Sequence, residues 1–284
     1  LMRGKKEKRE NKTNMTAEEQ LAAIMPKTAQ LQEDCDKYYA KALENLAACG
    51  YRKVDFDKLS KEDEHFWKKY FQSELFPILS PQIVDSRHPF PFLRNKEIYL
   101  GVLLHEKHTS EHTLGIVPIS SQMERMHFVR KDNETCFALT EELVLHYAAL
   151  IFGKENVQEK CLFRVTRNAD LDIDEESEDL LIEIQESIKK RKRGKPVRLE
   201  LSRRCDGELK EFLTEMLDVD DLDIYEIGGP LDLTFCFRLS SLDDRLRLPP
   251  ITPVPAVDFC GWSDMFAAIR ERDRFVHHPY ESFD

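Results

Sequence analysis

The fold class of this chain is indicated by two apolar stretches, IYLGVLL at residues 98–104 and TLGIVPI at residues 113–119. Both have the length of β-strands, and a polar loop separates them, which predicts a hairpin. Two shorter strand-like segments follow at residues 126–129 and 136–139. The loop between them is also of hairpin length, so this part of the chain is expected to form antiparallel β-structure.

Strands and helices alternate further along the chain. Strand-like segments occur at residues 162–166, 197–201 and 224–227, and helical segments are expected at about 174–193 and 208–217. Hairpins followed by such alternation predict an α+β fold with helices packed on a mixed β-sheet.

An α-helical segment precedes the sheet. Thr16 and Glu19 form a capping box, and apolar residues then recur with helical spacing to Leu46. Gly50 ends this helix. Pro26 either kinks it or restarts it.

Three further helices are expected outside the alternating region. Thr140 caps one that runs through Leu150 and Ile151 and is closed by Gly153. Another starts near Ser60 and carries an aromatic face that must be buried. The last follows a proline-rich linker at residues 248–255, begins at Ser263 and is amphipathic through Asp273. The aromatic face consists of Phe66, Trp67, Tyr70 and Phe71.

Composition restricts the possible partners and compartments. The net charge of −11 argues against a nucleic-acid partner. No apolar run approaches the ~20 residues of a membrane-spanning helix, and the basic start at residues 1–14 is not a secretory signal. Seven widely spaced cysteines without a CxxC pair indicate buried, reduced thiols in a cytoplasmic protein. A first residue other than Met suggests that the chain begins inside a longer gene product.

A histidine-rich loop at residues 105–112 is the first candidate for a ligand site. It contains three histidines and two glutamates, but its spacing is not the HExxH pattern of zinc proteases. We therefore expect a solvated hairpin loop and no metal site. His105 and Lys107 also imitate the HxK of phospholipase-D-type phosphotransferases, but His112 stands where that motif requires Asp.

A charge-segregated segment is the second candidate. Nine acidic residues lie between residues 170 and 186, and seven basic residues lie between 189 and 198. Acidic residues at the start of a helix and basic residues at its end complement the helix dipole. We favour that interpretation, with a weak anion contact at the basic end.

Arg164 and Arg167 are the third candidate. Strand alternation places Arg164 with Thr166 on one face and Val165 with Arg167 on the other. Arginine binds phosphate oxygens through two parallel hydrogen bonds. The two side chains could equally pair with the acidic residues just downstream, and the sequence leaves both alternatives open.

A cationic cluster at the end of the chain is the fourth candidate. Arg270 and Arg274 are four residues apart and would share a helix face. Together with His277, His278 and Tyr280 they could form one wall of an anion site. The alternative is a surface helix with alternating charges, which the spacing alone favours.

Several stretches taken in order resemble polyphosphate kinase, the family that polymerises the terminal phosphate of ATP. One departure is Glu124-Arg125, where the family usually has Pro-Arg. The matching stretches lie at residues 74–81, 88–93, 163–170, 197–200, 229–234, 268–273 and 278–283.

The resemblance implies a domain organisation. Residues 1–50 would be a basic arm and the last helix of the helical N-terminal domain. Residues 51–250 would form the middle, or head, domain, and residues 251–284 the linker and start of the first C-terminal catalytic domain. The phosphorylated histidine and the metal-binding arginines of the family would then lie beyond Asp284, and the adenine contacts before Leu1. No catalytic residue is assigned within this chain.

The resemblance also implies partners. The full-length enzyme would use ATP, Mg²⁺ and polyphosphate, whereas no cofactor is expected on this segment alone. The polyphosphate or nucleotide contacts would come from Arg164, Arg167, Arg270, Arg274, His277, His278 and Tyr280. Two roles follow for the segment, either as part of the wall of the phosphotransferase tunnel or as an interaction module that builds a homo-oligomer through the middle domain. The expected location is the cytoplasm, free or in a membrane-associated complex.

Overall fold

The computed structural model describes residues 9–85, 90–105, 112–131, 133–153, 156–168, 194–203, 205 and 207–282. The chain forms two compact units, residues 1–233 and 234–284, which are considered separately. Several expected features lie outside the described residues, namely the first eight residues, the helix at 174–193 and most of the histidine-rich loop.

The larger sheet of the first unit contains six strands in the order β2-β4-β3-β7-β8-β9. All neighbours are antiparallel except β8 and β9, which are parallel, so the sheet is mixed. The predicted hairpin, β3 and β4, lies within this sheet, and β3 is paired with β7 on its other side. The strands are β2 (Gln82–Val84), β3 (Ile98–His105), β4 (His112–Ile119), β7 (Val157–Arg167), β8 (Pro196–Ser202) and β9 (Ile224–Ile227).

A smaller sheet of three strands in the order β1-β6-β5 lies in the same unit. Here β5 (Met126–Lys131) and β6 (Glu134–Leu139) form the second predicted hairpin. The strand β1 (Tyr51–Lys53) joins β6 in parallel, directly after the first helix.

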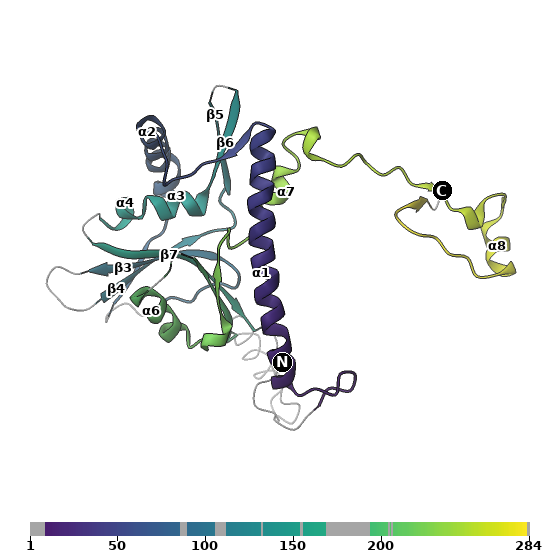
Figure 1. Ribbon diagram of the computed structural model, residues 1–284, viewed down its shortest axis with the longest axis horizontal. Coiled ribbons are helices and arrows are strands. Elements are labelled where there is room, and N and C mark those ends of the chain that lie inside the picture. Colours follow the sequence, from purple (N-terminus) through teal and green to yellow (C-terminus); the bar gives the residue numbers. More distant parts are fainter. Residues whose placement is uncertain are drawn as a thin grey trace, which may run out of the picture. The chain divides into compact units, whose positions relative to one another are not determined.

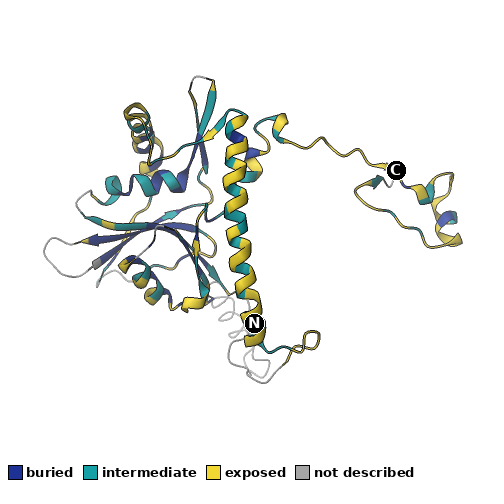
Figure 2. Cartoon of the chain, viewed as in Figure 1, coloured by how far each residue is buried: buried dark blue, intermediate teal, exposed yellow. Residues whose placement is uncertain are grey.

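That first helix, α1 (Ala17–Ala48), runs without interruption, and Pro26 lies inside it. Thr16 and Glu19 form the predicted capping box. The helix stands beside the sheets (Figure 1), and Leu46 is its buried residue. Most of its surface is exposed, whereas the strands are largely buried (Figure 2).

Alternation of side chains along the central strands divides the core of this unit into two clusters. Leu100 and Val102 of β3 belong to one cluster, and Tyr99 and Leu103 to the other. The helices α2 (Lys61–Tyr70), α3 (Thr140–His146) and α4 (Ala148–Phe152) cover the first face, and α6 (Glu208–Leu217) covers the second (Figure 1). The unit is therefore an α+β fold, with helices on mixed sheets and a preceding helical segment.

Local details at α2 differ in part from the sequence-based expectations. Ser60 caps α2 as predicted, and Trp67 and Phe71 are buried, but Phe66 remains 42% exposed. A π-helical turn (Phe71–Leu75) and a 3-10 turn (Phe76–Ile78) extend α2.

The second unit has little regular structure. It contains α7 (Cys236–Leu239), α8 (Met265–Glu271), and a parallel pair formed by β10 (Val254–Pro255) and β11 (Glu281–Ser282). The described residues also contain three further 3-10 turns, namely Asp221–Asp223 in the first unit and Asp244–Leu246 and Val257–Phe259 in the second.

The last helix is shorter than expected. Asp264, not Ser263, caps α8, because its carboxylate accepts the backbone N–H groups of Phe266 and Ala267. The helix ends at Glu271 rather than Asp273. Across the described parts of the chain, none of the helices combines the length and apolar character needed to cross a membrane.

Candidate functional site

Arg164, a candidate phosphate ligand, lies opposite Glu200 on the neighbouring strand β8. Its Nε donates to Glu200 Oε2 at 2.6 Å, and its Nη2 donates to Oε1 at 3.0 Å. Arg198 Nη2 also donates to Glu200 Oε1, at 3.0 Å. The Glu200 side chain is 5% exposed, so one buried carboxylate binds two guanidinium groups.

Arg198 is also held by an aromatic ring. Its guanidinium carbon lies 3.7 Å from the centre of the Tyr225 ring, a cation–π contact with β9. Arg164, Arg198, Glu200 and Tyr225 therefore tie three adjacent strands together. The carboxylate partner of Arg164 is Glu200 on β8, and the acidic residues just downstream of Arg167 lie outside the described residues.

Arg167 is engaged by backbone groups on the opposite face. Its Nε donates to the carbonyl oxygen of Leu93 and its Nη1 to that of Gly194, each at 2.9 Å. Its guanidinium carbon lies 4.6 Å from the centre of the Phe92 ring. This side chain connects the end of β7 to two loops.

Arg274 is 5% exposed and is likewise bound to its own unit. Because α8 ends at Glu271, the expectation that Arg274 shares a helix face with Arg270 is wrong. Its Nε donates to the carbonyl oxygen of Ala268 at 3.1 Å, and its Nη1 to that of Asp258 at 3.0 Å. Its Nη2 pairs with Glu271. Arg274 thus connects the segment after α8 to the helix and to the 3-10 turn at Val257–Phe259.

The other members of the terminal cluster are exposed. Arg270, His277, His278 and Tyr280 all lie at the surface of the second unit. His277 and Tyr280 contact each other edge to face, with ring centres 5.0 Å apart. These four side chains are therefore accessible to a ligand, whereas the guanidinium groups of Arg164, Arg167 and Arg274 are engaged in internal contacts.

A hollow of about 770 Å³ lies beside Arg274 within the second unit. Its lining is mainly apolar and includes Trp262, Met265, Ile269 and Phe275. Polyanions are bound by several converging cations, and this lining does not supply them.

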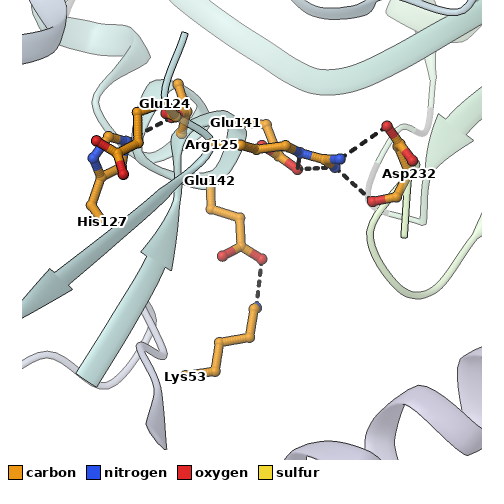
Figure 3. A network of polar contacts seen from close by, with 8 residues as sticks. Lys53, Glu124, Arg125, His127, Glu141, Glu142 and Asp232 are labelled. Carbon is orange, nitrogen blue, oxygen red and sulfur yellow. Dashed lines mark hydrogen bonds and ion pairs between the residues drawn. The ribbon is translucent and has the colours of Figure 1, made fainter. Parts of the chain in front are cut away.

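The structure also reveals a polar network that sequence reasoning missed (Figure 3). Arg125, which precedes β5, pairs with Glu141 in the first turn of α3 at 2.6 Å. It also pairs with Asp232 at 2.9 Å and donates to the carbonyl oxygen of that residue at 2.6 Å. Two features of the sequence drew attention to these residues, namely the Glu124-Arg125 departure and the matching stretch at 229–234. Neither feature indicated that Arg125 contacts Asp232.

Glu142, the next residue of α3, pairs with Lys53 of β1 at 2.5 Å (Figure 3). Burial raises the pKa of the Glu142 carboxyl above its usual range, although Lys53 opposes the shift. Its Oε2 atom is buried without a hydrogen-bond partner among the described residues. This pair joins the strand that follows α1 to the middle of the fold.

His127 of β5 is 5% exposed and is hydrogen-bonded through both ring nitrogens. Tyr70 Oη lies 2.8 Å from Nδ1, and Thr140 Oγ1 lies 2.7 Å from Nε2. Thr140 donates to the carbonyl oxygen of Glu124 at 2.6 Å and is the first residue of α3, so the expectation that it caps this helix is wrong. His127 therefore connects α2, β5 and α3.

Possible metal ligands and reactive thiols were the other groups of chemical interest in the sequence. Within them, no three His, Cys, Asp or Glu side chains are grouped as metal ligands, and the side chains at 106–112 lie outside the description. Cys161 and Cys205 are buried, but Cys260 is exposed, so burial of all the thiols was too general an expectation. Burial raises the pKa of Cys161, which makes its thiol unreactive.

The family model for the polyphosphate kinase middle domain matches residues 62–239, well over half of the chain. The chain belongs to the polyphosphate kinase family. It is 37% identical to the polyphosphate kinase of Halalkalibacterium halodurans, over 97% of this chain and 40% of that protein. Against the Streptomyces coelicolor polyphosphate kinase it is 31% identical, over 84% of this chain and 32% of that protein. The chain therefore spans about two fifths or less of these relatives.

A solved structure shares the fold. The crystal structure of polyphosphate kinase from Porphyromonas gingivalis matches with a TM-score of 0.68 and 18% identity, over 93% of this chain and 39% of that one. At this identity the match supports the fold of the chain and not the roles of its individual residues.

Proposed function

We propose that this chain is the middle part of a polyphosphate kinase that reversibly transfers the terminal phosphate of ATP to polyphosphate. The segment contributes scaffold, part of the tunnel wall and dimer contacts, and it is inactive alone. ATP, Mg²⁺ and polyphosphate are then ligands of the whole enzyme. The domain division at about residues 50 and 250, and a cytoplasmic location, are parts of the same proposal.

One observation carries the scaffold role: the guanidinium groups of Arg164, Arg167 and Arg274 are engaged in internal contacts. A phosphate site needs cations whose donors are available to the ligand. These three arginines would have to give up these partly buried hydrogen bonds first, at a cost of about 1–3 kcal/mol for each buried group left unpaired. We therefore assign them to the scaffold, and we keep Arg270, His277, His278 and Tyr280 as the candidate polyphosphate contacts.

Two histidines of the first unit are similarly engaged. His127 uses both ring nitrogens internally, and His146 places Nε2 3.1 Å from Glu64. A histidine that accepts a phosphoryl group needs an accessible nitrogen and nearby cations to neutralise the transferring group. His127 offers no accessible nitrogen, and His146 has one of its two nitrogens engaged by Glu64.

The test is incubation of the purified chain with labelled ATP and Mg²⁺, with the Halalkalibacterium halodurans enzyme as the positive control. We expect neither phosphohistidine nor polymer from the chain, with a cooperative melt showing that it is folded. Acid-labile label on His277 or His278, lost on mutation to Ala, would contradict the inactive scaffold.

The second candidate function is a non-catalytic interaction module, as expected if the middle domain builds the homo-oligomer. Sedimentation of the chain at high micromolar concentration, compared with a polyphosphate titration, separates the two roles. A dimer without polyphosphate binding favours the module, and salt-sensitive polymer binding by a monomer favours the tunnel wall.

A further inference from the structure

A contact between α1 and the turn after β9 joins two segments that are far apart in the sequence. Asp36 of α1 accepts the backbone N–H of Gly228 on Oδ2, at 2.8 Å, and that of Gly229 on Oδ1, at 3.1 Å. Each carboxylate oxygen therefore has its own amide donor. The Asp36 side chain is 17% exposed and Gly228 lies at the surface, so the contact is only partly shielded from water.

The two glycines are explained by the close approach of this carboxylate. A Cβ atom on Gly228 would lie 2.6 Å from Asp36 Oδ2 and 3.0 Å from the guanidinium of Arg203. A Cβ atom on Gly229 would lie 3.2 Å from Asp36 Oδ1. Neither glycine has a positive φ, so the backbone would accept a larger residue. Glycine is required at both positions because a Cβ atom would occupy the space of the Asp36 carboxylate.

The turn has the properties of an oxyanion site. Two successive backbone N–H groups point at one group, and the guanidinium of Arg203 lies 4.0 Å from Asp36 Oδ2. Successive amides of this kind form concave sites for carboxylate or phosphate oxygens. Here the anion that the two amides bind is the Asp36 carboxylate of the same chain.

The contact also fixes the direction of α1. The buried residue of this fully described helix is Leu46, near its C-terminal end. Asp36 lies ten residues earlier, about 15 Å along the helix axis at 1.5 Å per residue. Attachment at two separated points prevents the helix from pivoting about its C-terminal end. The family model begins at residue 62, so α1 lies outside the matched middle domain that it is attached to.

We propose that Asp36 and the Gly228–Gly229 turn form a latch that fixes α1 on the middle domain, in which the turn is an oxyanion site and Asp36 is its built-in ligand. Removal of the carboxylate frees α1 along most of its length. It also leaves a site of the right chemistry for a small carboxylate or for inorganic phosphate.

The first test uses Asp36→Ala in the full chain, with Asp34→Ala as the matched control. Asp34 lies on the same helix and is 45% exposed, and its contacts with described residues are to neighbours on that helix, Gln30 at 3.1 Å and Lys37 at 3.2 Å. Hydrogen exchange of the Gly228 and Gly229 amides should become at least about tenfold faster in Asp36→Ala, because protection follows local opening. Exchange in Asp34→Ala should match the wild type. Equal exchange in the two variants would overturn the latch.

The second test is chemical rescue of Asp36→Ala with sodium acetate and sodium phosphate, against sodium chloride at equal ionic strength. Acetate or phosphate should slow the exchange of both amides in a saturable manner. The double variant Asp36→Ala with Gly228→Ala should not respond, since the added Cβ occupies the site; its circular dichroism checks that it is folded. An equal response to chloride, or none to either oxyanion, would overturn the oxyanion site.

Discussion

Replacing Glu200 with glutamine would remove the charge that holds two arginines while keeping the volume of the side chain. Glu200 is 5% exposed and accepts three hydrogen bonds from Arg164 and Arg198. A glutamine carbonyl in the Oε1 position can keep the bonds from Arg164 Nη2 and Arg198 Nη2, but its amide group cannot accept the bond from Arg164 Nε. Both guanidinium groups would then remain close together without a counterion.

The cost can be estimated from the structure. Removal of one partner from a buried ion pair typically destabilises a protein by about 3–5 kcal/mol. Arg164 and Arg198 retain 20% and 22% of their side-chain exposure, so water screens part of the remaining charge. The lower limit, about 3 kcal/mol, is therefore expected for Glu200→Gln. With an m-value of about 3 kcal/mol/M, the urea midpoint should fall by about 1 M.

Tryptophan fluorescence gives a specific assay for this change. The two tryptophans are Trp67, which is buried in the first unit, and Trp262, in the second. In a Trp262→Phe background the signal reports the unit that contains Glu200. Glu33→Gln, on the exposed surface of α1, is the matched control and should change the stability by less than about 0.5 kcal/mol.

A midpoint for Glu200→Gln within about 0.2 M of the control would refute the structural role of the pair. The double variant Arg164→Gln with Glu200→Gln should recover part of the loss, because one unpaired cation is removed together with its partner. Strict additivity would show that the two side chains do not interact.

Three further predictions concern an arginine, the thiols and a buried carboxyl group. Arg167→Met should lower the free energy of unfolding by about 2 kcal/mol, measured by urea titration, because two backbone carbonyl groups lose a charged donor; an unchanged midpoint would contradict this. A thiol reagent followed by mass spectrometry should label Cys260 in the native chain and reach Cys161 and Cys205 only after unfolding. The raised pKa of Glu142 means that the folded chain binds more protons than the unfolded chain between the two pKa values, so its contribution to stability falls as the pH rises. The unfolding free energy of the wild type minus that of Glu142→Gln should therefore decrease from about pH 4.5 to 7, and an increase would refute the assignment.

Local features were predictable because their signals lie within a few residues of one another. The caps at Thr16 and Ser60 depend on a side chain and an amide three residues later. The two hairpins depend on apolar runs separated by short loops, and the family followed from several short stretches in a fixed order. Errors at this level were confined to element ends such as Thr140 and Ser263, where the actual contacts of the side chain decide its role.

The sequence by itself determined the α+β class, the order of the elements and the family of this protein. The tertiary structure alone decided what the arginines do, because a guanidinium binds a carboxylate and a phosphate with the same donors. Arg164 meets Glu200, 36 residues away, through the register of two strands. Asp36 accepts a hydrogen bond from Gly228, 192 residues away, because α1 packs beside the end of β9. Neither contact can be predicted from the periodicity of the sequence, because each depends on how distant elements pack together.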